Sequence, residues 1–137
     1  MGPSEVVRAV YDAWLAGDAA GAVALLSEDF EWVEPVEQVD SDTRRGRGGV
    51  LSSIEQWTGA WEEYRFEVLD LVAAGDRVFA RCRQSGRGQQ SGITVEADHY
   101  QVWTVRGERP VRMEMFLHEE PARRAAGLEP RTFRPSP

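Results

Sequence analysis

The chain has 137 residues and a net charge of −7, a length that suits one domain with its own core. An acidic surface argues against nucleic acid or an anionic membrane as a partner. The single cysteine, Cys82, allows no internal disulfide, and no apolar run suits a signal peptide or a membrane span, so we expect a cytoplasmic protein.

The first part of the chain predicts two helices and a short strand. Apolar residues recur at helical spacing over residues 6–15, and Gly17 ends this helix. Asp18 caps a second, shorter helix over residues 19–26. The period then changes, and a proline stops a short strand over residues 30–35.

A polar segment follows over residues 37–49. It is rich in Gly and Arg, which predicts a loop that rims a pocket or covers it. Helical spacing returns over residues 50–61, where one face carries two tryptophans, Trp57 and Trp61.

The second half predicts an antiparallel meander. The expected strands cover residues 64–73, 77–85, 93–105 and 111–117. A helical turn or two then fits residues 121–127, and the proline-rich residues 129–137 form a loose tail. Helices followed by a meander make an α+β arrangement, and a strongly curved sheet over three helices would enclose a cone-shaped cavity.

The strand over residues 93–105 carries a carboxylate at its centre. Burying an unpaired charge is costly, so Asp98 lies on a solvated face, in a salt bridge or in a catalytic site. Strand parity groups Asp98 with Tyr100 and Val102 and places His99 on the opposite, more apolar face. Alternation alone favours an outward Asp98 unless a β-bulge resets the faces.

Two segments carry a resemblance to known proteins. EVVRAVYDAWLAGDAAGAVALLSEDFEWVEP resembles the start of the NTF2-like superfamily, in particular ketosteroid isomerases and SnoaL-like polyketide cyclases. SGITVEADHYQVWTVRGERPVRMEMF is similar to the strands of SnoaL-like proteins. The resemblance covers residues 4–128 and implies one cone-shaped, cystatin-like α+β domain over residues 1–128, with three helices on a strongly curved antiparallel sheet. Since this fold hosts isomerases, cyclases, hydrolases and binding modules, it implies no single function.

The resemblance to ketosteroid isomerases implies roles for two carboxylates. In that family a strand-end carboxylate before a proline is the base that moves a proton next to a carbonyl, and here Glu34 precedes a proline. A protonated Asp in an Asp-His pair donates a hydrogen bond to the enolate, and here the pair is Asp98 and His99. The resemblance therefore implies an inward Asp98, and we adopt that prediction. The family's further donor is a Tyr on the first helix, whose position here is Val10, and Tyr11 lies about 100° around the helix.

Aromatic and sulfur-containing side chains are candidates for the pocket wall. We assign Trp14 and Trp103 to plain core packing. The predicted lining residues are Val10, Tyr11, Trp32, Trp57, Trp61, Tyr100, Val102, Met113 and Met115.

The remaining polar residues give no metal or nucleophile motif. Arg81 and Arg83 alternate with Cys82, which predicts a solvated or dimer-facing side for the arginines and a core position for the thiol. With two histidines far apart and no cysteine cluster, we expect neither a metal nor another cofactor.

Three functions stay open. The first is an isomerase that moves a proton next to a carbonyl of a hydrophobic polyketide- or steroid-like compound, with Glu34 as base and Asp98 as oxyanion donor. The second is a SnoaL-like cyclase or hydrolase that uses a single acid or base. The third is a non-catalytic ligand-binding or dimeric interaction module. In each case we expect a small hydrophobic ligand and a homodimer that forms through the sheets.

Overall fold

The computed structural model describes residues 2–35 and 43–129. The first part of the predicted rim loop, up to residue 42, and the predicted tail beyond residue 129 lie outside this range. The described helices are α1 (Pro3–Leu15), α2 (Ala19–Ala24), α3 (Gly46–Gly59) and α4 (Glu119–Ala125). None of them is long and apolar enough to cross a bilayer. The strands are β1 (Glu31–Val33), β2 (Thr43–Arg45), β3 (Trp61–Ala74), β4 (Arg77–Gly88), β5 (Thr94–Arg106) and β6 (Arg109–Phe116).

The strands form one six-stranded sheet in the order β2-β1-β6-β5-β4-β3. The four long strands make the predicted antiparallel meander. The sheet departs from the prediction at β1, which pairs parallel to β6. β2 was also not predicted, since its three polar residues show no alternation, and it exists because it pairs with β1.

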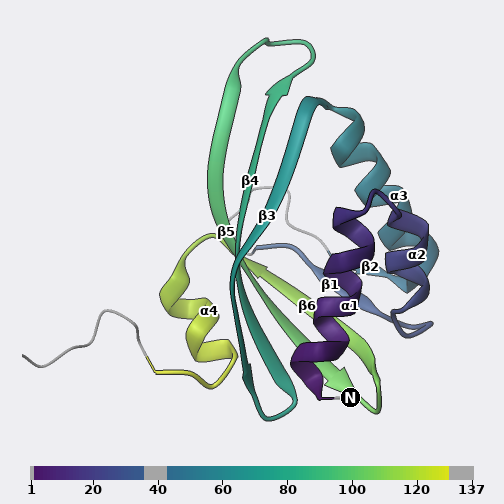
Figure 1. The fold of residues 1–137 in the computed structure, drawn as a ribbon, viewed down its shortest axis with the longest axis vertical. Helices are drawn as coiled ribbons and strands as arrows, with labels where there is room; N and C mark the ends of the chain where they lie inside the picture. Colours follow the sequence, from purple (N-terminus) through teal and green to yellow (C-terminus); the bar gives the residue numbers. More distant parts are fainter. Residues whose placement is uncertain (1, 36–42, 130–137) are drawn as a thin grey trace, which may run out of the picture.

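The sheet curves around the first three helices. Figure 1 shows α1, α2 and α3 on one side of the sheet and α4 on the other side. Register shifts interrupt the β3–β4 ladder between Val68 and Asp70, and the β5–β6 ladder between Thr104 and Val105. Such irregularities bend a strand and increase its twist. The β4–β5 ladder has no shift, so nothing resets the faces of β5 near Ala97.

Two clusters of buried side chains fix these layers. The larger cluster joins the predicted apolar stripe of α1 to the concave face of the sheet and includes Phe30 and Met113, both nearly inaccessible. Complete burial of such a side chain contributes about 1.5–3 kcal/mol. The smaller cluster seats α4 on the convex face, where Ala122 packs with Phe79 and Val102. The larger cluster leaves a space at its centre, which is the candidate site.

Candidate functional site

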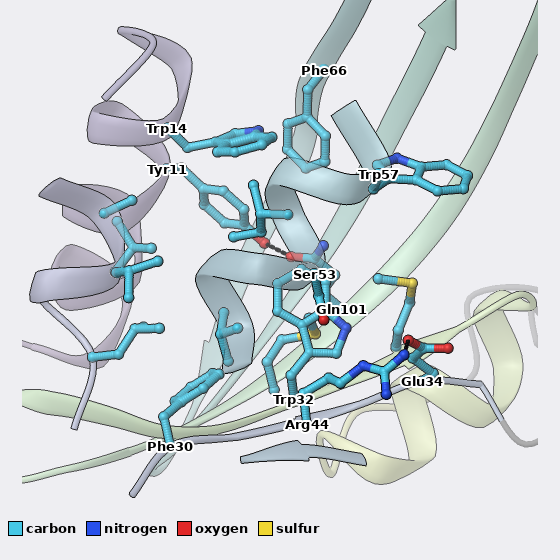
Figure 2. A pocket seen from close by; sticks show the side chains of 18 of the residues that line it. Tyr11, Trp14, Phe30, Trp32, Glu34, Arg44, Ser53, Trp57, Phe66 and Gln101 are labelled. Carbon is cyan, nitrogen blue, oxygen red and sulfur yellow. Dashed lines mark hydrogen bonds and ion pairs between the residues drawn. The ribbon is translucent and has the colours of Figure 1, made fainter. Parts of the chain in front are cut away.

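A cavity of about 420 Å³ lies between the concave face of the sheet and the first three helices. This volume is within the range of small-molecule pockets, about 300–1,000 Å³. Figure 2 shows its wall, which is mainly aromatic and aliphatic. The predicted lining residues that do line it are Val10, Tyr11, Trp32, Trp57, Met113 and Met115.

The cavity has a closed end and an open end. Phe30 and Val50 line it and are almost completely buried. Trp57 also lines it but is 46% exposed, and the side chains of Glu34 and Arg44 are 24% and 38% exposed. We infer that the mouth of the cavity lies where these three partly exposed side chains meet its wall.

Glu34 follows the end of β1 and lines the cavity. Phe30, Trp32 and Glu34 share one parity, and all three line the cavity as their spacing predicts. Arg44 lies opposite Trp32 in the β1–β2 pair, and its Nη2 is 3.8 Å from Oε1 of Glu34. Arg44 was missed because it falls in the segment predicted as a loop. The role of Glu34 as a base stays a prediction.

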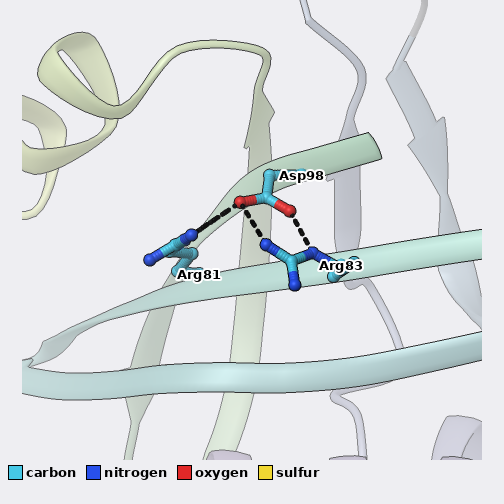
Figure 3. Close-up of polar contacts among 3 residues, drawn as sticks. All are labelled: Arg81, Arg83 and Asp98. Atoms are coloured by element: carbon cyan, nitrogen blue, oxygen red, sulfur yellow. Dashed lines mark hydrogen bonds and ion pairs between the residues drawn. The ribbon is translucent and has the colours of Figure 1, made fainter. Parts of the chain in front are cut away.

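Asp98 lies on the opposite face of the sheet, so the prediction that it shares the pocket is wrong. Figure 3 shows it between Arg81 and Arg83 of the neighbouring strand. Its Oδ1 is 2.7 Å from Nε of Arg83, and its Oδ2 is 2.8 Å from Nη2 of Arg81. Hydrogen bonds from Arg83, and then from Arg81, lower the pKa of the Asp98 carboxyl. An ionised Asp98 has no proton to donate to an enolate.

Three further lining predictions are also wrong. Tyr100 and Val102 share the outward face of Asp98, where Val102 packs under α4 and Tyr100 stacks on Phe79 at 6.1 Å between ring centroids. α3 ends at Gly59, so Trp61 is the first residue of β3 and does not lie on the predicted helix face. It packs against Trp57 with ring centroids 5.3 Å apart and does not line the cavity.

The wall contains a buried polar chain that sequence reasoning missed. The indole Nε1 of Trp103 donates to the hydroxyl of Tyr11 at 2.8 Å, and that hydroxyl donates to Oε1 of Gln101 at 2.5 Å. Nε2 of Gln101 lies 3.1 Å from Nε2 of His99. Trp14 and Trp103 pack in the larger buried cluster, as predicted, and both also line the cavity, which was not predicted. The sequence did carry a signal for this chain, since His99, Gln101 and Trp103 alternate along one strand and therefore point to the same face.

Burial keeps the titratable groups of this wall uncharged near neutral pH. It raises the pKa of the Tyr11 hydroxyl well above its usual value and lowers the pKa of His99 to about 4. It also raises the pKa of the Cys82 thiol to about 12. Cys82 is completely buried, which confirms its predicted core position, and a thiol with such a pKa is a poor nucleophile.

A second polar group lies nearer the mouth. Oε1 of Gln84 accepts hydrogen bonds from Nε1 of Trp57 at 3.3 Å and from the hydroxyl of Tyr64 at 3.0 Å. Both aromatic residues line the cavity, as Gln84 does. Burial raises the pKa of Tyr64 to about 12, so this hydroxyl keeps its proton as well.

The described residues offer no constellation for a metal ion. No three His, Cys, Asp or Glu side chains among them converge on one point. His99 is the histidine that lines the cavity, and its Nε2 faces the amide of Gln101. The expectation that the protein needs no metal and no other cofactor stays a prediction.

Comparisons with known proteins agree with the fold. Residues 7–113 match the family model of the SnoaL-like domain. An NTF2-like protein from Burkholderia thailandensis E264 is 25% identical, with a TM-score of 0.79 over 94% of this chain and 99% of that chain. TerC, co-crystallised with polyporic acid, is 23% identical, with a TM-score of 0.72 over 85% and 92% of the two chains. A protein with a ketosteroid isomerase-like fold from Catenulispora acidiphila, in complex with trimethylamine, is 18% identical, with a TM-score of 0.71 over 96% and 98%. No curated protein matches the sequence.

Proposed function

Because the chain belongs to the SnoaL-like domain family, we propose that it binds a small, largely apolar carbonyl compound and moves a proton on it with Glu34. The observation that carries the proposal is a cavity of about 420 Å³ whose wall is mainly apolar and whose mouth carries one carboxylate. Similar folds in TerC and in the Catenulispora acidiphila protein hold polyporic acid and trimethylamine, which supports a small molecule as the ligand.

In this proposal Glu34 is a general base. It takes a proton from a carbon next to the carbonyl and returns it to another carbon, while the electrons of the broken C–H bond form an enolate. In the same proposal the guanidinium of Arg44, close to Glu34, stabilises that negative charge. Asp98 takes no part, since it lies on the other face of the sheet.

A cyclase or hydrolase with one acid or base is compatible with the same residue. Among the described residues that line the cavity, Glu34 is the one carboxylate, so one group would both accept and deliver the proton. The identity of the product distinguishes this reaction from an isomerisation.

A non-catalytic binding module is the second candidate function. The observation that favours it is the hydroxyl of Tyr11, which accepts from Trp103 and donates to Gln101. Its one proton is therefore already used and is not available to a developing oxyanion. In enzymes that use such a donor, its loss lowers the reaction rate by roughly 10²–10³-fold.

Hydrogen–deuterium exchange tests the proton transfer without knowledge of the natural substrate. The probe is 2-tetralone, a cyclic ketone fused to a benzene ring, whose protons beside the carbonyl exchange in D₂O and are followed by NMR. We expect the protein to accelerate exchange and Glu34→Gln to reduce the acceleration by roughly 10²–10⁴-fold. Glu31→Gln is the matched control, since Glu31 lies on the same strand but pairs with Arg45 and Arg112 outside the cavity. Equal exchange by Glu34→Gln and the wild type would contradict the role of Glu34.

Binding is tested separately with the hydrocarbon fluorene and quenching of tryptophan fluorescence. Ser53 lines the cavity, and its neighbour Ser52 is exposed. Ser53→Trp fills the cavity and should weaken binding at least about tenfold, a loss of about 1.4 kcal/mol, whereas Ser52→Trp should not. If neither the wild type nor Ser52→Trp binds fluorene, the cavity is not a site for flat apolar molecules.

The homodimer and the cytoplasmic setting also stay proposals. α4 covers the convex face at Phe79 and Val102, so a dimer through the sheets would use the charged part of that face, around Arg83 and Asp98. Light scattering should then give twice the monomer mass for the wild type. Arg83→Glu, which reverses one charge of that surface, should shift the mass toward the monomer.

A further inference from the structure

The polar part of the cavity wall offers hydrogen-bond donors and acceptors unequally, which the proposed function does not explain. Gln84 of β4, together with His99 and Gln101 of β5, lines one side of an otherwise mainly apolar cavity. Each of the three side chains can both donate and accept hydrogen bonds. Which of these capacities is still open decides what ligand chemistry the wall can recognise.

The acceptor of Gln101 is already occupied. An indole N–H can only donate, so the hydroxyl of Tyr11 accepts from Trp103 and its own proton goes to Oε1 of Gln101. Gln101 then turns its NH₂ group toward Nε2 of His99 at 3.1 Å. An amide NH₂ can only donate as well, so Nε2 of His99 carries no proton.

The same chain fixes the state of His99. A neutral imidazole whose Nε2 accepts must carry its proton on Nδ1. This Nδ1 is buried and has no hydrogen-bond partner among the described residues. The imidazolium form would set an N–H of His99 against the N–H of Gln101, so the contact geometry itself disfavours a charge. His99 therefore offers the cavity no free acceptor, and its Nδ1 is too deeply buried to meet a ligand.

Gln84 repeats the arrangement with different partners. Its Oε1 accepts from both Trp57 and Tyr64, which occupies the two lone pairs of the amide oxygen. Its NH₂ group has no acceptor in the part of the chain that the structure describes. Along the wall, aromatic N–H and O–H groups thus occupy the amide oxygens and leave amide N–H groups open.

We propose that this wall, defined by Gln84, His99 and Gln101, selects ligands whose inner polar group is a proton-free acceptor, such as a ketone or quinone oxygen. The inference rests on the proposed function in one respect, namely that the cavity binds a ligand. A ligand that covers an open amide N–H without accepting from it leaves that donor without a partner, whereas a ligand oxygen accepts from it. A primary amine or an ammonium group would bring further donors to a wall that already has them in excess.

The test compares 9-fluorenone with fluorene, which has the same rings and no oxygen. Gln84→Glu keeps the oxygen that accepts from Trp57 and Tyr64 and replaces the open NH₂ group with a second acceptor oxygen. We expect it to weaken 9-fluorenone binding by about tenfold and to change fluorene binding less than about twofold. Equal losses for both ligands would overturn the inference and leave the proposed function standing. Failure of the wild type to bind either ligand would overturn both.

Two measurements on the wild type do not depend on how the variants fold. The infrared carbonyl band of bound 9-fluorenone should lie at lower wavenumber than in an alkane, and a band at the alkane position would contradict a donating wall. Nitrogen-15 NMR of labelled histidine should show His99 as the neutral Nδ1–H tautomer at pH 7. A proton on Nε2 would reverse the chain and overturn the inference.

Discussion

Asp98 and His99 are neighbours on β5 and occupy opposite kinds of surface. His99 is 4% exposed and is held uncharged in a chain of aromatic and amide groups. The Asp98 side chain is 24% exposed and is held ionised by Arg81 and Arg83. The two faces of one strand thus solve the cost of polar burial differently: the concave face keeps hydrogen bonds without charge, and the convex face keeps charge near water.

The difference has an energetic consequence. Partly exposed ion pairs contribute about 0.2–1 kcal/mol because water and salt screen them. Removing the partner of a buried hydrogen-bonding group costs about 1–3 kcal/mol of stability. Truncating a buried aromatic side chain costs more. We therefore expect the concave face to dominate stability, and the predictions below run from the largest expected effect to the smallest.

Trp103→Ala should have the largest effect on stability. The indole is 5% exposed, packs against Tyr11 and Phe30 with ring centroids 5.6 and 6.0 Å apart, and donates to Tyr11. Urea denaturation should give a loss of about 3–5 kcal/mol in the free energy of unfolding. Trp103→Phe, which keeps an aromatic ring, should lose clearly less. A loss below about 1 kcal/mol for Trp103→Ala would show that the concave face does not dominate.

The pH dependence of stability should come from His99 between about pH 6.5 and 4. Its pKa falls from an ordinary 6.5 to about 4 on folding, so the unfolded chain takes up the proton first as pH falls. This contribution is complete above about pH 7, and up to about 3 kcal/mol is lost by pH 4. His99→Gln should remove this loss from a series of denaturation curves. The control replaces the exposed His118, which lies outside the buried chain.

Tyr11→Phe should have an intermediate effect. It keeps the ring but removes a hydroxyl that serves both Trp103 and Gln101, and so leaves two buried polar groups without partners. We expect a loss of about 1–3 kcal/mol in thermal or chemical denaturation. An unchanged stability would mean that water replaces the hydroxyl in the wall.

Asp98→Asn should have the smallest effect at neutral pH. Because the pKa of Asp98 is lowered on folding, its contribution is present above the ordinary Asp pKa of about 4 and is lost as pH falls below it. We expect a loss below about 1 kcal/mol at pH 7 and unchanged binding of fluorene. A clear loss of ligand binding, with the fold intact, would reconnect Asp98 to the cavity and break the division between the two faces.

Part of the site could be predicted from spacing alone. Glu34 was predicted correctly at the cavity because Phe30, Trp32 and Glu34 alternate along a short strand, and all three line it. Asp98 was predicted wrongly because resemblance was preferred to alternation. The alternation was correct, since the β4–β5 ladder runs without a bulge past that residue. Family likeness therefore identified the strand but not the face of this carboxylate.

The sequence by itself determined the α+β order of elements, the apolar stripe of α1 and the core position of Cys82. These features depend on periodicity, which is local in the chain. Only the tertiary structure decided that Arg44 meets Glu34, that β1 runs parallel to β6, and that Trp103, Tyr11, Gln101 and His99 form one chain. Such contacts join residues as much as 92 positions apart, as between Trp103 and Tyr11. They depend on how the curved sheet closes over the helices, and no local pattern records that closure.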